Sequence, residues 1–181
     1  DAGGTEMPRA NSGGSREVAL PAVLAALSLL LLYGASIAPG GRMGLVALSG
    51  LIPAAAVVSG GLRAGLMCYA AAGILGLILV PDKGSALLYL LFFGLYPVIK
   101  SRAERLRTRL AEYGLKLACF NLAVTILWFG FRGLFLPFLP EALRMTALVY
   151  LVGNPVFLAY DFGCSKVIAL YLARLGRRLG K

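Results

Sequence analysis

Six apolar stretches, each long enough to cross a lipid bilayer, follow one another along a chain of only 181 residues. A membrane-spanning helix needs about 20 predominantly apolar residues. The stretches are residues 18–38, 43–60, 62–80, 84–100, 115–136 and 144–173. Little of the chain remains for a soluble domain, so the sequence predicts an all-α integral membrane protein with six transmembrane helices.

The composition excludes a water-soluble fold. Apolar residues make up 59% of the chain and charged residues only 14%, whereas charged residues are about a quarter of a typical soluble protein. The net charge of +10 comes from basic residues that lie beside the apolar stretches and not on one soluble face. We therefore expect anionic membrane lipids as partners, and no nucleic acid.

The basic residues also predict an orientation, because lysine and arginine are enriched in the cytoplasmic connections of membrane proteins. The connections that would face outward hold only Arg42, Lys83, Arg132 and Arg144. The segments that would face inward hold Arg9, Arg16, Arg63, Lys100, Arg102, Arg105, Arg107, Arg109, Lys116, Arg174, Arg177, Arg178 and Lys181. Both termini are therefore predicted to be cytoplasmic.

The sequence divides into three segments. Residues 1–17 are rich in glycine and serine and are predicted to be a disordered N-terminal segment, residues 18–175 form the six-helix transmembrane domain, and residues 176–181 are a basic C-terminal tail. Within the domain, the inner connection 100–116 (KSRAERLRTRLAEYGLK) has a basic face and a modest apolar edge. This pattern predicts an amphipathic helix at the inner headgroup layer or a docking surface for a cytoplasmic partner.

The second half of the chain carries polar and aromatic residues at helical spacing. Residues at i, i+4, i+7 and i+11 share one helix face, and three spans each present such a stripe. The stripes are Tyr89, Phe93, Tyr96 and Lys100; Asn121, Thr125, Trp128 and Arg132; and Tyr150, Asn154, Phe157 and Asp161.

At matched depth, the outer parts of these stripes predict a binding cavity among the last three spans. Its expected lining is Tyr89, Phe93, Trp128, Arg132, Tyr150 and Asn154. A few polar groups in an apolar concavity are typical of a small-molecule site. The expected ligand is small, partly aromatic or planar, and neutral or anionic. In the alternative interpretation, the same residues pack against one another or lie in an interfacial aromatic belt.

Asp161 is the only acidic residue predicted inside a span. A carboxylate there costs about 2.5–3.5 kcal/mol on insertion scales, so it should find a partner inside the bundle. Lys100 lies at the same depth, and Asn121 is a second candidate in this inner polar clasp. The clasp could be purely structural, could couple transport to protons or ions, or could contact a ligand.

No pattern of catalysis or metal binding is present. The chain contains no GxSxG, HExxH or P-loop sequence and no histidine, and its cysteines, Cys68, Cys119 and Cys164, lie within predicted spans without a CxxC pair. We therefore expect no enzyme activity, no metal and no cofactor.

Ala22 and Ala26 lie four residues apart in LPAVLAALSLL, within the first span. This spacing, together with the predicted six helices and cytoplasmic termini, resembles the substrate-binding S component of energy-coupling factor (ECF) transporters, which are bacterial importers of vitamins and trace metals. VPDKGSALLYLLFFGLYPVIK and GNPVFLAYDFGCSKVIALY are similar to bacterial membrane proteins related to S components. The resemblance implies that Ala22 and Ala26 contact a transmembrane T component.

It also implies a bacterial inner-membrane protein with an S-component-like bundle. Such a subunit captures a vitamin-like molecule from outside among its last three helices and passes it inward with the T component and partner ATPases. The first alternative is a membrane scaffold or regulatory subunit that does not transport. The second is an ion- or proton-coupled carrier that uses Asp161.

Overall fold

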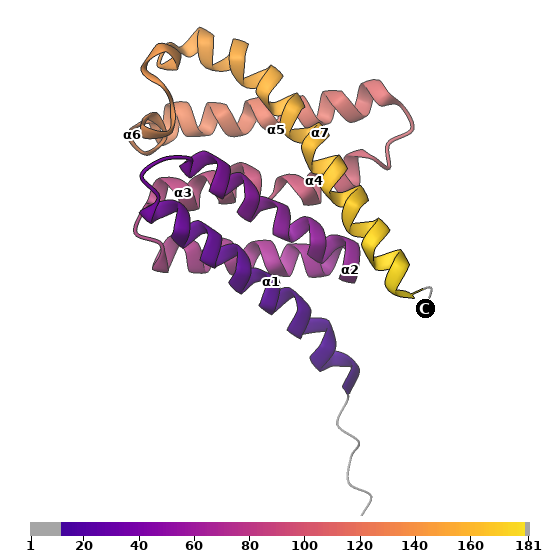
Figure 1. The fold of residues 1–181 in the computed structure, drawn as a ribbon. Helices are drawn as coiled ribbons and strands as arrows, with labels where there is room; N and C mark the ends of the chain where they lie inside the picture. The colour runs from indigo at the N-terminus through magenta and orange to yellow at the C-terminus, as the bar shows by residue number, and fades with distance from the viewer. Residues whose placement is uncertain (1–11, 180–181) are drawn as a thin grey trace, which may run out of the picture.

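The computed structural model describes residues 12–179, and within this range the chain consists of helices joined by short connections, without a strand (Figure 1). Two segments of π-helix lengthen helices in the second half of the chain: η1 (Tyr89–Phe93) joins α3 to α4, and η2 (Ile126–Gly130) extends α5. The α-helices are α1 (Ser12–Ile37), α2 (Arg42–Leu79), α3 (Lys83–Leu88), α4 (Tyr96–Ala103), α5 (Arg109–Thr125), α6 (Arg132–Phe135) and α7 (Thr146–Leu179), with short 3-10 turns η3 (Leu136–Phe138) and η4 (Glu141–Leu143).

Five helical stretches are long and apolar enough to cross a membrane. They are Glu17–Ile37, Arg42–Leu79, Lys83–Ala103, Arg109–Gly130 and Thr146–Arg174. The all-α architecture predicted from the sequence is confirmed for the described residues, and its helices have the length and composition of a multi-pass membrane protein.

The longest stretch, α2, turns back on itself at Gly61, which has non-helical angles of φ 76° and ψ −176°. A Cβ atom on Gly65 would lie 3.4 Å from the carbonyl oxygen of Pro53, although 12 residues of straight helix span about 18 Å. The two halves of α2 therefore lie side by side (Figure 1). They correspond to the predicted spans 43–60 and 62–80, and glycine suits the turn because positive φ strains other residues.

The N-terminal boundary differs from the prediction. Helix α1 begins at Ser12 and not at residue 18, because helix propagation adds one hydrogen bond for each residue fixed once a long apolar helix has nucleated. The predicted disordered segment 1–17 thus overlaps α1 at residues 12–17, and residues 1–11 lie outside the described range. At the other end, α7 continues to Leu179, so helix also includes most of the predicted tail 176–181.

The connection 100–116 does not form a separate amphipathic helix. It consists of the end of α4, a turn over residues 104–108, and the first turns of α5. Thr108 caps α5 by accepting a hydrogen bond from the Ala111 N–H at 3.4 Å, as serine and threonine commonly do at helix starts.

Helix α1 packs along α2 through one face. Ala25, Ser28 and Leu32 on this face are buried, and the Ser28 hydroxyl donates a hydrogen bond to the carbonyl of Ser49 on α2 at 2.7 Å. Ala22 and Ala26 lie on the opposite side of α1 and are exposed.

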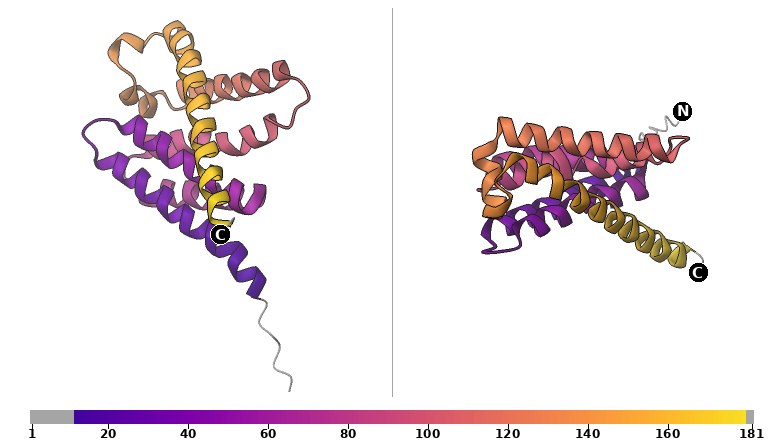
Figure 2. Two further views of the ribbon diagram at one scale, coloured as in Figure 1. Left: turned by 45° about the vertical axis from the view of Figure 1, so that its right-hand side comes forward. Right: turned by 90° about the horizontal axis from the view of Figure 1, so that it is seen from above.

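The connections alternate between the two ends of the bundle (Figure 1). The α1–α2, α2–α3 and α5–α7 connections lie at one end, and the turn in α2 and the α4–α5 connection lie at the other. Helix α7 crosses the bundle obliquely (Figure 2), and in its C-terminal part the Tyr171 hydroxyl lies 2.9 Å from the Ser59 hydroxyl of α2. Its polar contacts with the other helices therefore determine how it is held.

A close backbone approach between α2 and η1 gives a testable consequence. A Cβ atom on Gly50 would lie 2.5 Å from the carbonyl oxygen of Phe93, a distance that requires the backbone to move. Gly50→Ala should therefore lower the free energy of unfolding by about 1–3 kcal/mol, the usual cost of overpacking, measured by thermal unfolding in detergent. Gly44→Ala is the matched control on α2, because a Cβ atom at Gly44 meets nothing within 4 Å. Equal melting temperatures for the two variants would contradict this packing.

Candidate functional site: an apolar cavity beside a buried ion cluster

A cavity of about 230 Å³ lies among η1, α5 and α7. Hydrocarbon groups provide almost all of its wall. The connection between α5 and α7 closes one end with Phe135, Phe138 and Leu139. The remaining lining residues are Met43, Leu88, Phe92, Phe93, Phe120, Ala123, Val124, Leu127, Pro140, Leu143, Val149, Val152, Gly153, Val156, Phe157 and Tyr160.

Both π-helical segments contribute to this wall. Phe92 and Phe93 come from η1, and Leu127 comes from η2. A π-helix places an extra residue in a turn and is frequent at functional sites. The break between η1 and α4 is explained by Pro97, which occupies the start of α4 and has no N–H to continue the preceding helical hydrogen bonds.

Aromatic rings close the other end of the cavity. Phe120 and Phe157 stack at 4.7 Å between ring centroids with an angle of 10° between their planes, and Phe92 meets them edge to face at 5.4 and 5.7 Å. Tyr96 meets Phe157 edge to face at 5.2 Å. Such arrangements are the favoured geometries of aromatic pairs. This aromatic layer separates the cavity from the charged residues beyond it.

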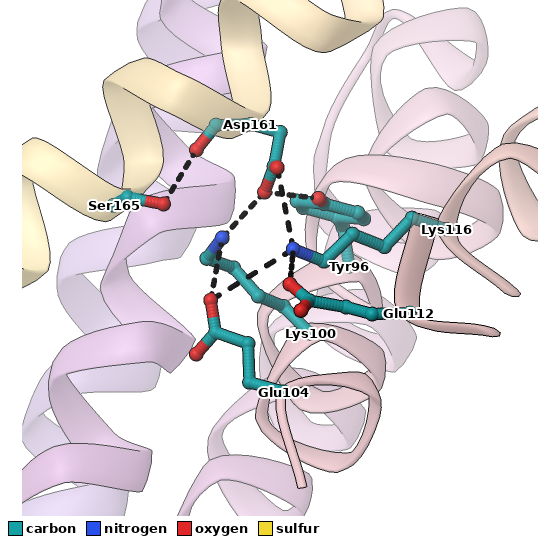
Figure 3. A network of polar contacts seen from close by, with 7 residues as sticks. All are labelled: Tyr96, Lys100, Glu104, Glu112, Lys116, Asp161 and Ser165. Carbon is teal, nitrogen blue, oxygen red and sulfur yellow. Dashed lines mark hydrogen bonds and ion pairs between the residues drawn. The ribbon is translucent and has the colours of Figure 1, made fainter. Parts of the chain in front are cut away.

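Asp161 on α7 lies at the centre of a buried ion cluster (Figure 3). The Tyr96 hydroxyl donates to its Oδ1 at 2.5 Å, the Lys100 ammonium donates to the same oxygen, and Lys116 Nζ donates to Oδ2 at 3.3 Å. Lys100 and Lys116 are each 2% exposed and Asp161 is 6% exposed. Because breaking a buried pair leaves an uncompensated charge, this cluster fixes α7 against α4 and α5.

Two glutamates extend the cluster. Glu104 lies 2.8 Å from Lys100 Nζ and 3.8 Å from Lys116 Nζ, and Glu112 lies 2.6 Å from Lys116 Nζ. Two ammonium groups therefore face three carboxylates. The Lys100–Glu104 and Glu112–Lys116 pairs have the i,i+4 spacing of helical ion pairs, a signal that was present in the sequence.

A second polar network joins α5 to α7. The amides of Asn121 and Asn154 are hydrogen-bonded at 2.9 Å, the hydroxyls of Thr125 and Tyr150 lie 2.7 Å apart, and the Trp128 Nε1–H donates to the Thr146 hydroxyl at 3.1 Å. The three pairs follow the antiparallel register of the two helices. They form a ladder that holds these helices together.

The predicted substrate-binding residues are mostly elsewhere than in the cavity wall. Of the six, only Phe93 lines the cavity. Trp128, Tyr150 and Asn154 belong to the ladder, and Arg132 stacks over the Trp128 ring at 4.8 Å. Tyr89 is buried beside Tyr69, with 6.1 Å between their ring centroids. For Trp128, Tyr150 and Asn154 the physical reason is that polar side chains of two neighbouring helices satisfy one another, since an unpaired polar group in an apolar interior is costly.

The predicted inner clasp contains partly different residues from those expected around Asp161. The structure places Lys100 against Asp161 and adds Tyr96 and Lys116. Asn121 does not contact Asp161 but pairs with Asn154. Asn121 lies five residues beyond Lys116, which is about 7.5 Å along α5, so Lys116 and not Asn121 reaches the level of Asp161.

The chemical character of the site is that of an apolar cavity beside a buried cluster of charges. The carboxylate of Asp161 is already engaged by two ammonium groups and a phenol. Among residues 12–179, no group of three or more histidine, cysteine, aspartate or glutamate side chains is arranged to hold a metal ion. The cavity can accommodate an apolar molecule, and the aromatic layer and ion cluster close it on one side.

Fold and site together define a bundle of membrane-length apolar helices with a partly open apolar cavity. Comparisons with family models, with curated proteins and with solved structures find no match.

Proposed function

We propose that this protein is a small-molecule-binding subunit of a bacterial importer, of the ECF S-component kind, with six spans and both termini in the cytoplasm. The observation that carries the proposal is the apolar cavity of about 230 Å³ among η1, α5 and α7. Concave, mostly apolar sites of this kind are where proteins bind small molecules.

The proposed direction is capture from outside. The basic residues gather at the end of the bundle that holds the α4–α5 connection, and basic connections favour the cytoplasmic side. The cavity then lies toward the outer side, below the α5–α7 connection. The aromatic layer and the Asp161 cluster lie between the cavity and the cytoplasm.

The proposed ligand is compact and mainly hydrocarbon. The nearly apolar wall favours this ligand over the anionic one that the sequence pattern allowed, because a charged or polar ligand group would lose its hydrogen bonds to water without replacement. Arg132, the expected partner of an anion, stacks on Trp128 and is absent from the cavity wall.

The proposed partners are a T component and ATPases. The chain has no nucleotide-binding sequence, so energy for import would come from other subunits. Ala22 and Ala26 are exposed on the side of α1 that does not pack on α2, and small side chains let helices approach closely in lipid. This surface is therefore open to a neighbouring membrane helix.

Purification of the tagged protein from its native membrane tests this proposal. Mass spectrometry of the eluate should find a multi-pass membrane subunit and ATPases, together with an apolar small molecule released by solvent extraction. Ala22→Leu with Ala26→Leu should lose the protein partners and keep the small molecule, since the added bulk lies outside the cavity. Recovery of neither partners nor a small molecule from the unmodified protein would contradict the proposal.

A membrane scaffold is the second candidate, and the α5–α7 ladder favours it. Three side-chain pairs close the polar stripes against each other, as expected for a packing core. Under this alternative, the cavity holds no saturable ligand.

A further inference from the structure

In the α4–α5 connection (residues 100–116), the acidic side chains point toward buried lysines and the arginine side chains are exposed. Its two acidic residues, Glu104 and Glu112, both pair with the buried lysines of the Asp161 cluster. The four arginines, Arg102, Arg105, Arg107 and Arg109, are all exposed. Within the described part of the chain, their side chains make no ion pair or hydrogen bond to other residues. The exposed surface of this connection therefore carries positive charge that no other side chain in the described part of the chain balances.

Apolar side chains are exposed on the same connection. Leu110, in the first turn of α5, is 89% exposed, and Leu106 and Tyr113 are 43% and 45% exposed. The connection directly follows one membrane-length helix and leads into the next, so it lies at the depth where a bilayer changes from headgroups to acyl chains. At this depth, exposed arginines can contact the lipid headgroups and the neighbouring leucines can contact the acyl chains.

We propose that the surface formed by Arg102, Arg105, Leu106, Arg107, Arg109 and Leu110 binds the phosphate group of an anionic phospholipid. Guanidinium groups bind phosphate oxygens in a bidentate manner, and the leucines enter the acyl region of the same leaflet. A membrane lipid is favoured over a soluble acidic partner because the exposed leucines lie next to the arginines at the ends of the two spans. This binding does not depend on the proposed transport function.

The lipid surface is directly linked to the ion cluster. Arg105 follows Glu104, which contacts both Lys100 and Lys116. A lipid that orders the connection would also hold Glu104 in place. Bound anionic lipid should therefore raise the thermal stability of the whole protein.

The test uses the full chain in neutral detergent with phosphatidylglycerol, which is anionic, or phosphatidylcholine, which has no net charge. Native mass spectrometry counts retained lipids, and thermal unfolding measures stabilisation. Phosphatidylglycerol should be retained more strongly and should raise the melting temperature more than phosphatidylcholine. Arg105→Gln with Arg107→Gln should weaken its retention about 30-fold, since each of the two basic residues near the surface contributes about 1 kcal/mol. The matched control, Arg132→Gln with Arg144→Gln, removes the same charge at the other end of the bundle and should retain the lipid as the unmodified protein does.

Two further arms distinguish a lipid from other anions. Inorganic phosphate and polyglutamate should displace little phosphatidylglycerol, and Leu110→Gln should weaken retention of the lipid although the arginines remain. Equal retention of the two lipids would overturn the proposal, as would equal losses in both double variants. Full displacement by inorganic phosphate or by polyglutamate would also overturn it, by assigning the surface to a soluble anion or an acidic protein.

Discussion

Asp161→Asn should lower the free energy of unfolding by about 3 kcal/mol, the lower part of the range for breaking a buried ion pair. The substitution keeps the size of the side chain but removes the charge that Lys100 and Lys116 share. Both ammonium groups then stay buried with only their glutamate partners. The measurement is unfolding of the purified protein in detergent, by heat or by titration with a denaturing detergent.

Combining Asp161→Asn with Lys100→Met should restore part of the lost free energy of unfolding. The double variant removes one positive and one negative charge, and Lys116 keeps Glu112 at 2.6 Å. Non-additive losses are expected for residues in one network. Lys166→Met is the control, because Lys166 is an exposed lysine on the same helix and should change stability by no more than about 0.5 kcal/mol. A structural role for the cluster would be disproved by additive losses or by an Asp161→Asn variant as stable as the control.

Ala123→Phe should abolish binding of an apolar ligand in the cavity. Ala123 is 4% exposed and contributes to the cavity wall from α5, so the added ring occupies the space that a ligand would take. Ala118→Phe makes the same change at an exposed position of α5 and should leave binding intact. In the unmodified protein, a saturable ligand would distinguish the proposed binding subunit from a scaffold.

Ligand binding in the cavity can be measured by the fluorescence of Trp128, because it is the only tryptophan of the chain. Its ring lies 6.4 Å from that of Phe135, which lines the cavity. Iodobenzene, an apolar ring with a heavy atom, should quench its emission in two parts: a saturable part from the cavity and a linear part from the detergent. Ala123→Phe should lose the saturable part alone. The same quenching curve in all three proteins would mean that the cavity does not bind this probe.

Helix positions could be read from the sequence because each apolar stretch must satisfy its backbone hydrogen bonds internally in lipid. Even the turn within α2 was marked by Gly60 and Gly61. The helical spacing also identified the faces that carry Tyr96, Lys100 and Asp161. Helix positions and helix faces are local properties of the chain, so the spacing of residues in the sequence is enough to predict them.

The partner of each polar side chain was not fixed by periodicity. A stripe on α5 can face a cavity, lipid or another stripe, and the tertiary structure pairs it with α7. The π-helical segments added to this uncertainty, because an extra residue in a turn changes which side chains face inward. Phe93 was therefore the one expected residue that lines the cavity, and the rest of the wall is hydrocarbon that no polar pattern marked.

The sequence by itself determined that the chain is a bundle of membrane-length helices, and that Asp161 must be neutralised inside it, because both follow from the cost of placing polar groups in an apolar medium. Only the tertiary structure decided that Lys116 joins Lys100 on Asp161, that Asn121 bonds to Asn154, and that an apolar cavity remains beside them. Those outcomes depend on the axial offset and rotation of helices that are distant in sequence. A shift of one helical turn, about 5.4 Å, would have given each polar group a different partner.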